Sequence, residues 1–265
     1  MKGIQRLVRI ATTLLSVYYA YMVEYRAELV LWVLSGSLPI ILMGVWIQAS
    51  QTGQFALTGI EFARYFLAIF FVRQLTVVWV IWEFEREIVE GRLSFRLLQP
   101  LNPFWHHFTS HLAERLARLP FAVVLIGLFF WLYPQAIWVP TLGQVALALV
   151  VTGFAFTLRF LIQYSLAMLA FWTERASALE QFSFLFYLFL SGMIAPLEMF
   201  PPLVRTIAEW TPYPYLMYFP ASILVGLPVD IGRGLLVMTG WSLFFLLVCR
   251  WLWRKGLRQY SGMGA

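Results

Sequence analysis

The 265-residue chain is 61% hydrophobic and only 12% charged, with a formal net charge of +6 and a mean hydropathy of +0.77. Soluble domains are about 45–50% apolar and about 25% charged, so this composition excludes a soluble globular protein and indicates an integral membrane protein. A basic balance in such a protein reflects topology and anionic lipid, and no basic-aromatic groove points to nucleic acid. The single cysteine, Cys249, makes neither an intrachain disulfide nor a zinc site.

The N-terminal segment carries three basic residues, Lys2, Arg6 and Arg9, before an apolar run. The following stretch "TLLSVYYAYMVEYR" has no small-residue cleavage site, which argues against a removable signal peptide. We therefore expect residues 1–25 to form an amphipathic helix on the membrane surface.

Six further stretches are apolar and long enough to suggest membrane spans, for which about 20 residues are needed. The fifth is short and runs into prolines; the stretches are 29–48, 62–82, 119–138, 145–171, 181–195 and 232–252. Fourteen of the 19 Lys and Arg residues lie near the two termini or in the 83–118 and 172–180 loops. The positive-inside rule therefore places both termini and these loops in the cytoplasm, and residues 196–231 outside.

Charge concentrates in the loop after the second stretch, where seven of the fourteen residues from Glu83 to Arg96 are charged. Read as a helix over 84–98, this loop has an apolar face made of Phe84, Ile88, Gly91, Phe95 and Leu98. Pro100 ends the helix. Gly91 costs about 1 kcal/mol relative to Ala, which favours a close contact or a bend at that position. A solvated loop would explain the charges but not the apolar face or the proline.

The outside segment contains seven of the 13 prolines, between Pro196 and Pro228, yet it stays apolar. Proline-broken apolar segments are typical of short half-helices that re-enter the membrane where protein covers their backbone. A loop lying flat on the bilayer surface is the alternative interpretation.

Arg73 and Arg159 lie well inside the second and fourth stretches. An arginine at a span centre costs about 2.5–3.5 kcal/mol on insertion scales and usually faces the protein interior or a water-filled cavity. The two residues are candidates for a translocation path or an anionic head group. The structural alternative is bonding to backbone carbonyls or to a glutamate of a neighbouring helix or subunit, and we expect no acidic residue at mid-span to pair with them.

Two other function classes fit parts of the sequence. His107, His111 and Glu114 have the i, i+4, i+7 spacing of a metal site, so a membrane-embedded enzyme using the His106, His107 and His111 cluster is one alternative, although H-E-x-x-H is absent. An ion-coupled secondary transporter is another, but it usually needs titratable residues at mid-membrane and internal repeats. The pattern G-x-x-x-x-G-K-[ST] does not occur, so the chain supplies no phosphate-binding loop of its own.

The charged segment up to Asn102 contains G-x-L-x-x-x-L-L-x-P-L-N and resembles the coupling-helix region of type-2 ATP-binding-cassette exporter permeases. The stretches "VEYRAELVLW", "AFWTERASALEQ", "SGMIAPLEMFPP", "PYPYLMYFP" and "LWRKGLRQYSGMGA" agree with this family in order and spacing. The resemblance implies an all-α membrane protein of the bacterial plasma (inner) membrane. It would have six transmembrane helices, an N-terminal surface helix, a coupling helix over 84–98 and re-entrant helices within 196–228.

The resemblance also implies the partners. Two permeases, identical or related, would pair in the lipid membrane, and each coupling helix would dock on a separate ATPase subunit that holds ATP and Mg²⁺. The chain itself would have no catalytic residue, metal or cofactor. The coupling residues would be Glu83, Glu85, Arg86, Ile88, Glu90, Gly91, Arg92, Leu93, Phe95, Leu98 and Pro100. The extracellular gate would be formed by Ser191, Gly192, Pro196, Glu198 and Pro201.

Overall fold

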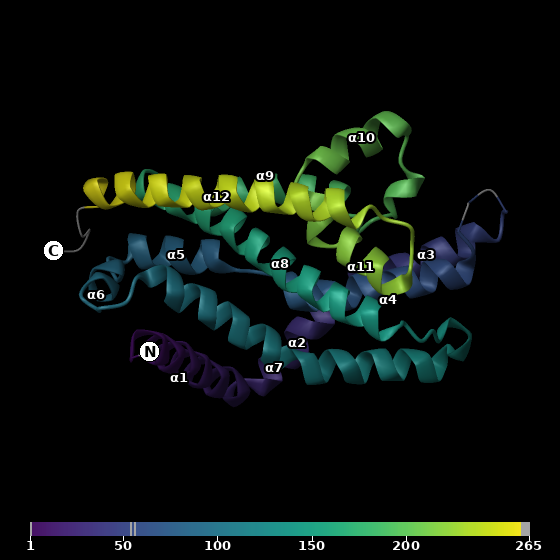
Figure 1. Cartoon of the computed structure of the whole chain (residues 1–265), viewed down its shortest axis with the longest axis horizontal. Helices are drawn as coiled ribbons and strands as arrows, with labels where there is room; N and C mark the ends of the chain where they lie inside the picture. Colours follow the sequence, from purple (N-terminus) through teal and green to yellow (C-terminus); the bar gives the residue numbers. More distant parts are fainter. Residues whose placement is uncertain (1, 54, 56, 261–265) are drawn as a thin grey trace.

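A computed structural model describes residues 2–53, 55 and 57–260, so the first residue of the predicted surface helix and the last five of the C-terminal motif lie outside the described residues. Every regular element within these residues is a helix. The long helices lie side by side in an elongated bundle (Figure 1). The start of α1 (Lys2–Glu24), the short α6 (Leu93–Leu97) and the end of α12 (Ile231–Gln259) share one end of the bundle.

Five helical segments of the described chain are long and apolar enough to cross a membrane. Three of these segments each consist of two consecutive helices: α2 (Arg26–Ser35) with α3 (Leu38–Ser50), α4 (Gly59–Thr76) with α5 (Val80–Val89), and α8 (Leu142–Ala167) with η2 (Met168–Phe171). The other two segments are the single helices α7 (Pro103–Leu132) and α12. The predicted fifth span corresponds to α9 (Ser177–Leu190), which is apolar but has only 14 residues.

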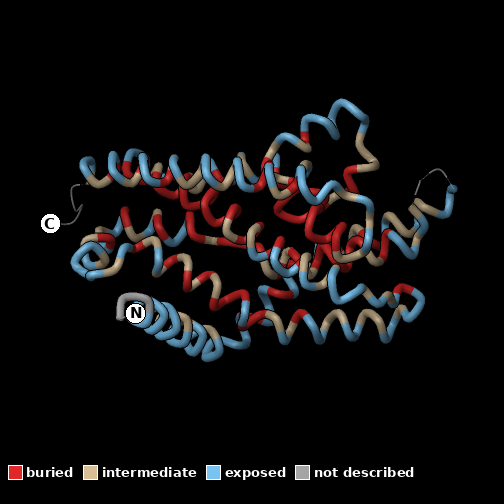
Figure 2. Tube along the Cα trace, viewed as in Figure 1, coloured by how far each residue is buried: buried red, intermediate tan, exposed pale blue. Residues whose placement is uncertain are grey.

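The predicted surface helix is confirmed as a helix, α1, while its place on a membrane stays a prediction. It packs along α7 and is exposed over most of its length (Figure 2). Tyr18 joins the two helices through a 3.0 Å hydrogen bond between its hydroxyl and His106 Nδ1.

The predicted boundaries of the third span, residues 119–138, are wrong, and so is the long loop before it. Helix α7 already begins at Pro103, where Asn102 caps it by accepting a hydrogen bond of 2.9 Å from Phe104 N. The charges that suggested a loop are buried, and Glu114 binds both Arg115 and Arg118. The helix ends at Leu132, before the 3₁₀ turn η1 (Pro134–Ala136).

The prediction of one continuous helix over 84–98 is also wrong. Helix α5 ends at Val89, and Gly91 has a φ of 70°, a left-handed conformation that glycine adopts without steric cost. The chain then forms the separate helix α6, in which Leu93 is fully buried. Phe95 and Leu98 are 70% and 84% exposed, so they do not share the buried face of Phe84 and Ile88.

The core runs along the middle of the bundle, where α4 and α8 are buried (Figure 2). The outside segment contains two short α-helices and two 3₁₀ turns: η3 (Leu197–Met199), α10 (Pro202–Trp210), η4 (Tyr213–Leu216) and α11 (Tyr218–Val225). Helix α11 packs against α4 and α8. In α10 only Ala208 is buried, so just one of these helices enters the core.

Helix α12 packs closely against the end of α8. Gly256 faces Phe171, and a Cβ built on this glycine would lie 2.1 Å from Phe171 Cδ2. Within the described chain, nothing lies within 4 Å of a Cβ built on Gly240 of the same helix.

We therefore expect Gly256→Ala to lower the stability of the detergent-solubilised protein by about 1–3 kcal/mol, because a buried contact becomes overpacked. Gly240→Ala is the matched control and should gain up to about 1 kcal/mol in helix propensity. Thermal unfolding followed by circular dichroism measures both, and equal melting temperatures would contradict the packing.

Candidate functional site

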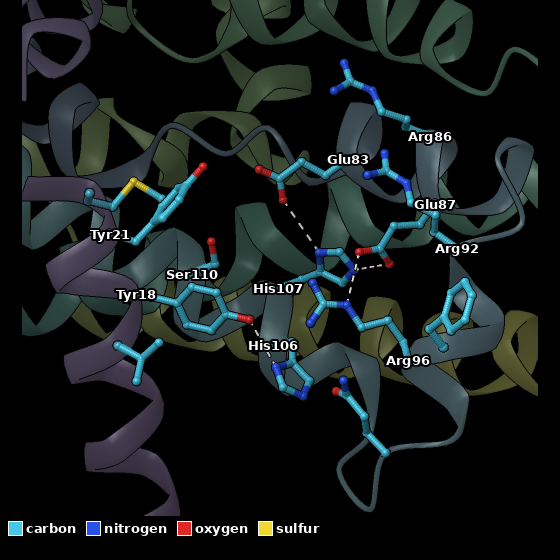
Figure 3. Close-up of a pocket in the computed structure, with 14 residues that line it drawn as sticks. Tyr18, Tyr21, Glu83, Arg86, Glu87, Arg92, Arg96, His106, His107 and Ser110 are labelled. Carbon is cyan, nitrogen blue, oxygen red and sulfur yellow. Dashed lines mark hydrogen bonds and ion pairs between the residues drawn. The ribbon is translucent and has the colours of Figure 1, made fainter. Parts of the chain in front are cut away.

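A cavity of about 660 Å³, with several charged side chains in its lining, lies between α1 and the α5–α6–α7 segment (Figure 3). Tyr18 and Tyr21 of α1 form one wall. The titratable side chains on the other walls are Glu83, Arg86, Glu87, Arg92, Arg96, His106 and His107. The segment in which charge concentrates in the sequence thus lines a cavity together with the N-terminal helix.

His107 joins two turns of α5 to α7. Its Nε2 lies 3.2 Å from Glu87 Oε2, and its Nδ1 lies 3.6 Å from Glu83 Oε2 (Figure 3). Arg96 of α6 contributes a third link, from its Nε to Glu87 Oε1 at 3.3 Å. Burial disfavours the charged Arg96 guanidinium, but the Glu87 carboxylate and the Tyr18 hydroxyl together favour it, so the pKa of Arg96 is raised above its ordinary value. Glu87 therefore holds α5, α6 and α7 together through charge-assisted contacts.

Glu85 connects α5 to the start of α9. Its carboxylate accepts hydrogen bonds from the Ser177 backbone N at 2.6 Å and the Ser177 hydroxyl at 3.0 Å. The first N–H groups of a helix lack partners within the helix, and a carboxylate there also interacts favourably with the helix dipole. Glu85 thus serves α9, although the sequence suggested it as a contact for a partner protein.

The turn at Gly91 is connected to the end of α12. The Tyr260 hydroxyl lies 3.1 Å from both the Gly91 carbonyl oxygen and the Ser94 hydroxyl. Leu93 packs in a cluster with Phe84 and with Leu252 of α12. The C-terminal helix therefore contacts the turn in two ways, through the Tyr260 hydroxyl and through Leu252.

The predicted coupling residues fall into two groups. The first group makes contacts within the chain and consists of Glu83, Glu85, Ile88, Gly91 and Leu93. The exposed residues, which are available to another molecule, are Arg86, Glu90, Arg92, Phe95, Leu98 and Pro100. Glu90 and Arg92 form an exposed ion pair of 2.6 Å.

The contacts that the coupling segment makes with other helices were not predicted from the sequence. They involve His107, Ser177 and Tyr260, which lie 20, 92 and 169 positions from their partners. The helical spacing used to interpret the charged loop reaches only a few residues along the chain. No local signal could have indicated these three residues.

Arg73 and Arg159 line a second cavity together with Glu180. Glu180, which the sequence placed in a loop, is buried on the first turn of α9, so this acidic residue approaches the arginines from a helix end and not from mid-span. Glu180 nevertheless accepts a hydrogen bond from Gln163 Nε2 at 2.8 Å, while Arg159 donates to the Tyr187 hydroxyl at 2.6 Å.

Three of the five predicted gate residues, Ser191, Gly192 and Glu198, lie near the start of α11. The Ser191 carbonyl accepts from Tyr218 N at 3.0 Å, and the Gly192 carbonyl accepts from the Tyr65 hydroxyl at 2.7 Å. Glu198 binds the Tyr218 hydroxyl, whose pKa is raised by burial and by this carboxylate, so the hydroxyl remains a donor. The two prolines do not join this cluster: Pro196 precedes η3, and Pro201 precedes α10.

The three histidines differ in their contacts, although Glu83 Oε2 lies near two of them, 3.6 Å from His107 Nδ1 and 3.9 Å from His111 Nε2. His106 bonds to Tyr18, His107 lies between the two glutamates, and His111 Nδ1 lies 2.8 Å from the His107 carbonyl oxygen. Glu114 binds Arg115 and Arg118 instead of joining His107 and His111. Among the described residues, no group of three or more His, Cys, Asp or Glu side chains is arranged to hold a metal ion.

The Glu85 contact can be tested by thermal unfolding in detergent. We expect Glu85→Ala to lower the stability by about 1 kcal/mol, as is typical when a helix N-terminus loses its side-chain acceptor. Glu90→Ala removes the same charge from an exposed ion pair and should change the stability little. If the Glu85→Ala variant is as stable as the Glu90→Ala variant, the hydrogen bonds between Glu85 and Ser177 do not stabilise the packing of α5 against α9.

Comparison with known proteins agrees with this architecture. No curated protein matches the chain. The family model described as ABC-2 family transporter protein matches residues 55–264, which include the coupling segment, both arginines and the gate residues. The chain therefore belongs to the ABC-2 transporter family and is a multi-pass permease component of an ATP-binding-cassette transporter.

Proposed function

We propose that this permease is one membrane subunit of an ATP-driven exporter and that the α5–α6 turn docks on a separate ATPase subunit. One observation carries the proposal: exposed apolar and charged side chains project from a turn that is bonded to α7, α9 and α12. A displacement of such a turn by a bound partner would be transmitted to several helices. ATP and Mg²⁺ would bind to the ATPase, and this chain would perform no covalent chemistry.

The docking surface consists of Phe95 and Leu98, with the Glu90 and Arg92 ion pair beside them. Large apolar side chains that insert into a partner's pocket carry much of the energy of an interface. Charges at the rim contribute mainly orientation and association rate. The exposed side of the turn therefore has the features expected of a protein-binding surface.

Movement of the turn would reach the spans through specific bonds. Glu85 would move α9, Glu87 would move α7 through His107, and Gly91 would act on α12 through Tyr260. ATPase closure would thus shift the population between inward-facing and outward-facing states, because each state presents the turn differently to the ATPase. Arg73 and Arg159 would line the path, and the Ser191 and Gly192 segment would begin the gate.

The short helix α9 fits a six-span topology if the residues after it complete the crossing. Its 14 residues span about 21 Å, less than the roughly 30 Å hydrocarbon core. Non-helical backbone at membrane depth needs partners within the protein. The carbonyls of Ser191, Gly192 and Ile194 have such partners, the last being Trp46 Nε1 at 2.8 Å.

The same end of the bundle contains the start of α1, α6 and the end of α12 (Figure 1). This arrangement supports placing both ends of the bundle's chain on the ATPase side, which in the proposed function is the cytoplasmic face of a bacterial plasma membrane. Two permeases, copies of this chain or a related second one, would pair to enclose the path. The use of the histidines in contacts around the coupling segment supports transport over an enzyme built on His106, His107 and His111.

The docking surface predicts a specific loss of binding. The double variant Phe95→Asp, Leu98→Asp should reduce co-purification with the ATPase subunit by at least about tenfold, since two apolar anchors are replaced by charges. The matched control is Val139→Asp, which changes a 90% exposed apolar residue between α7 and α8. The measurement is quantitative mass spectrometry of the tagged permease and its bound nucleotide-binding subunit.

Thermal unfolding of both variants separates loss of docking from loss of folding. Wild-type permease that is purified from its native membrane without any nucleotide-binding subunit would contradict the proposed function. Equal recovery of the ATPase subunit with the double variant and with Val139→Asp would show that the docking surface is not formed by Phe95 and Leu98.

A further inference from the structure

The second cavity has a volume of about 310 Å³ and lies where α4–α5, α8 and α9 meet. Arg73 comes from the middle of the second span, and Arg159 comes from the fourth. Glu180, on the first turn of α9, is the third charged residue of the lining. The lining therefore carries one excess positive charge.

Neither arginine is neutralised within the described part of the chain. Arg159 is only 7% exposed and binds Tyr187, through the 2.6 Å hydrogen bond and by stacking its guanidinium 4.1 Å from the ring centroid. Arg73 Nε is buried and has no hydrogen-bond partner. Among the described residues no carboxylate forms an ion pair with either arginine, and the Glu180 carboxylate accepts a hydrogen bond from Gln163. A buried charge without a counter-charge is costly, so an anion in the cavity would stabilise both arginines.

The backbone beside the cavity is interrupted. Helix α4 ends at Thr76 and α5 begins at Val80, so a break falls inside the 31-residue second span. Residues 77–79 in this break line the cavity. Broken helices are tolerated at membrane depth where they line a cavity, and transporters use the freed ends of such helices to bind ligands. Trp79 Nε1, which is buried and has no partner, supplies a further unused donor.

The remaining wall is mostly apolar. It is formed by Val77, Val78, Trp82 and Phe184, together with the amide side chains of Gln163 and Gln181. Trp82 and Phe184 are each 37% exposed, so the cavity opens onto the surface of the single chain. A cationic pair beside an apolar opening is complementary to a molecule with an anionic head and an apolar tail.

We infer that this cavity binds the anionic head group of a membrane amphiphile through Arg73 and Arg159. The head group would be a phosphate or a carboxylate, which guanidinium groups bind with charge-assisted hydrogen bonds. The inference deepens the proposed permease function and rests on it, because it names the ligand class of the proposed path.

Phosphatidylglycerol and phosphatidylcholine serve as the anionic and zwitterionic probes. The purified full-length permease is exchanged into detergent with equal amounts of both lipids, and retained lipid is measured by native mass spectrometry. Wild type should retain phosphatidylglycerol preferentially. The double variant Arg73→Gln, Arg159→Gln should weaken this retention by about tenfold, as expected for loss of a buried charged hydrogen bond.

Two further variants keep the test decisive if the double variant does not fold. Glu180→Gln retains an acceptor for Gln163 but removes the competing carboxylate, so phosphatidylglycerol retention should increase. Arg175→Gln removes one positive charge from an exposed position near α9 and should leave retention unchanged. Equal retention of the two lipids by wild type, or no increase with Glu180→Gln, would overturn the inference.

A reconstituted complex with the ATPase distinguishes cargo from a resident lipid. ATP-dependent movement of fluorescent phosphatidylglycerol to the opposite leaflet identifies cargo, and retention without movement identifies a resident lipid; both outcomes support the binding site. Recovery of the ATPase is measured in the same preparations. Loss of ATPase recovery with intact lipid selectivity would overturn the proposed export function and leave the binding site standing.

Discussion

Polar groups inside an apolar bundle lose their hydration, and the structure depends on how each one is compensated. Glu114 is surrounded by Arg115 and Arg118 in the first half of α7, which allows a charged stretch to be buried helix instead of loop. Carbonyls of the non-helical segment after α9 receive hydrogen bonds from Tyr65, Tyr218 and Trp46. At Arg73 and Arg159 no carboxylate of the described residues forms an ion pair, and this is where a ligand site is inferred.

The coupling segment follows the same constraint with a different result. Its inward side chains, Glu85 and Glu87, are each satisfied by another helix, so the turn is part of the bundle and not a flexible loop. Its outward side chains, Phe95 and Leu98, have no such partners among the described residues and remain exposed. One short segment therefore combines firm internal attachment with an open surface, which is the combination that a force-transmitting contact requires.

Much of the architecture could be predicted because it rests on local signals. Apolar length located the membrane helices, and proline density located the short helices between α9 and α12. Predictions failed where a local signal had two meanings. The charges at Arg115 and Arg118 indicated solvent but are paired in a helix, and the glycine at position 91 was compatible with both a bend and a tight contact. Helical spacing over 84–98 could not choose between one helix and two, because Phe95 and Leu98 fit the same apolar face only if the helix continues through Gly91.

The sequence by itself determined the class of molecule, an all-helical membrane permease, and the segment in which charge concentrates. Composition and apolar length suffice for this, since burial in a bilayer is a property of each segment taken alone. Only the tertiary structure decided which charges are satisfied and by what. Glu85 accepts a hydrogen bond from Ser177, the Gly91 carbonyl accepts one from Tyr260, and Arg73 lines a cavity with Arg159 and Glu180. These groups are far apart along the chain, and their energies depend on distance and desolvation, which exist only once the helices have packed.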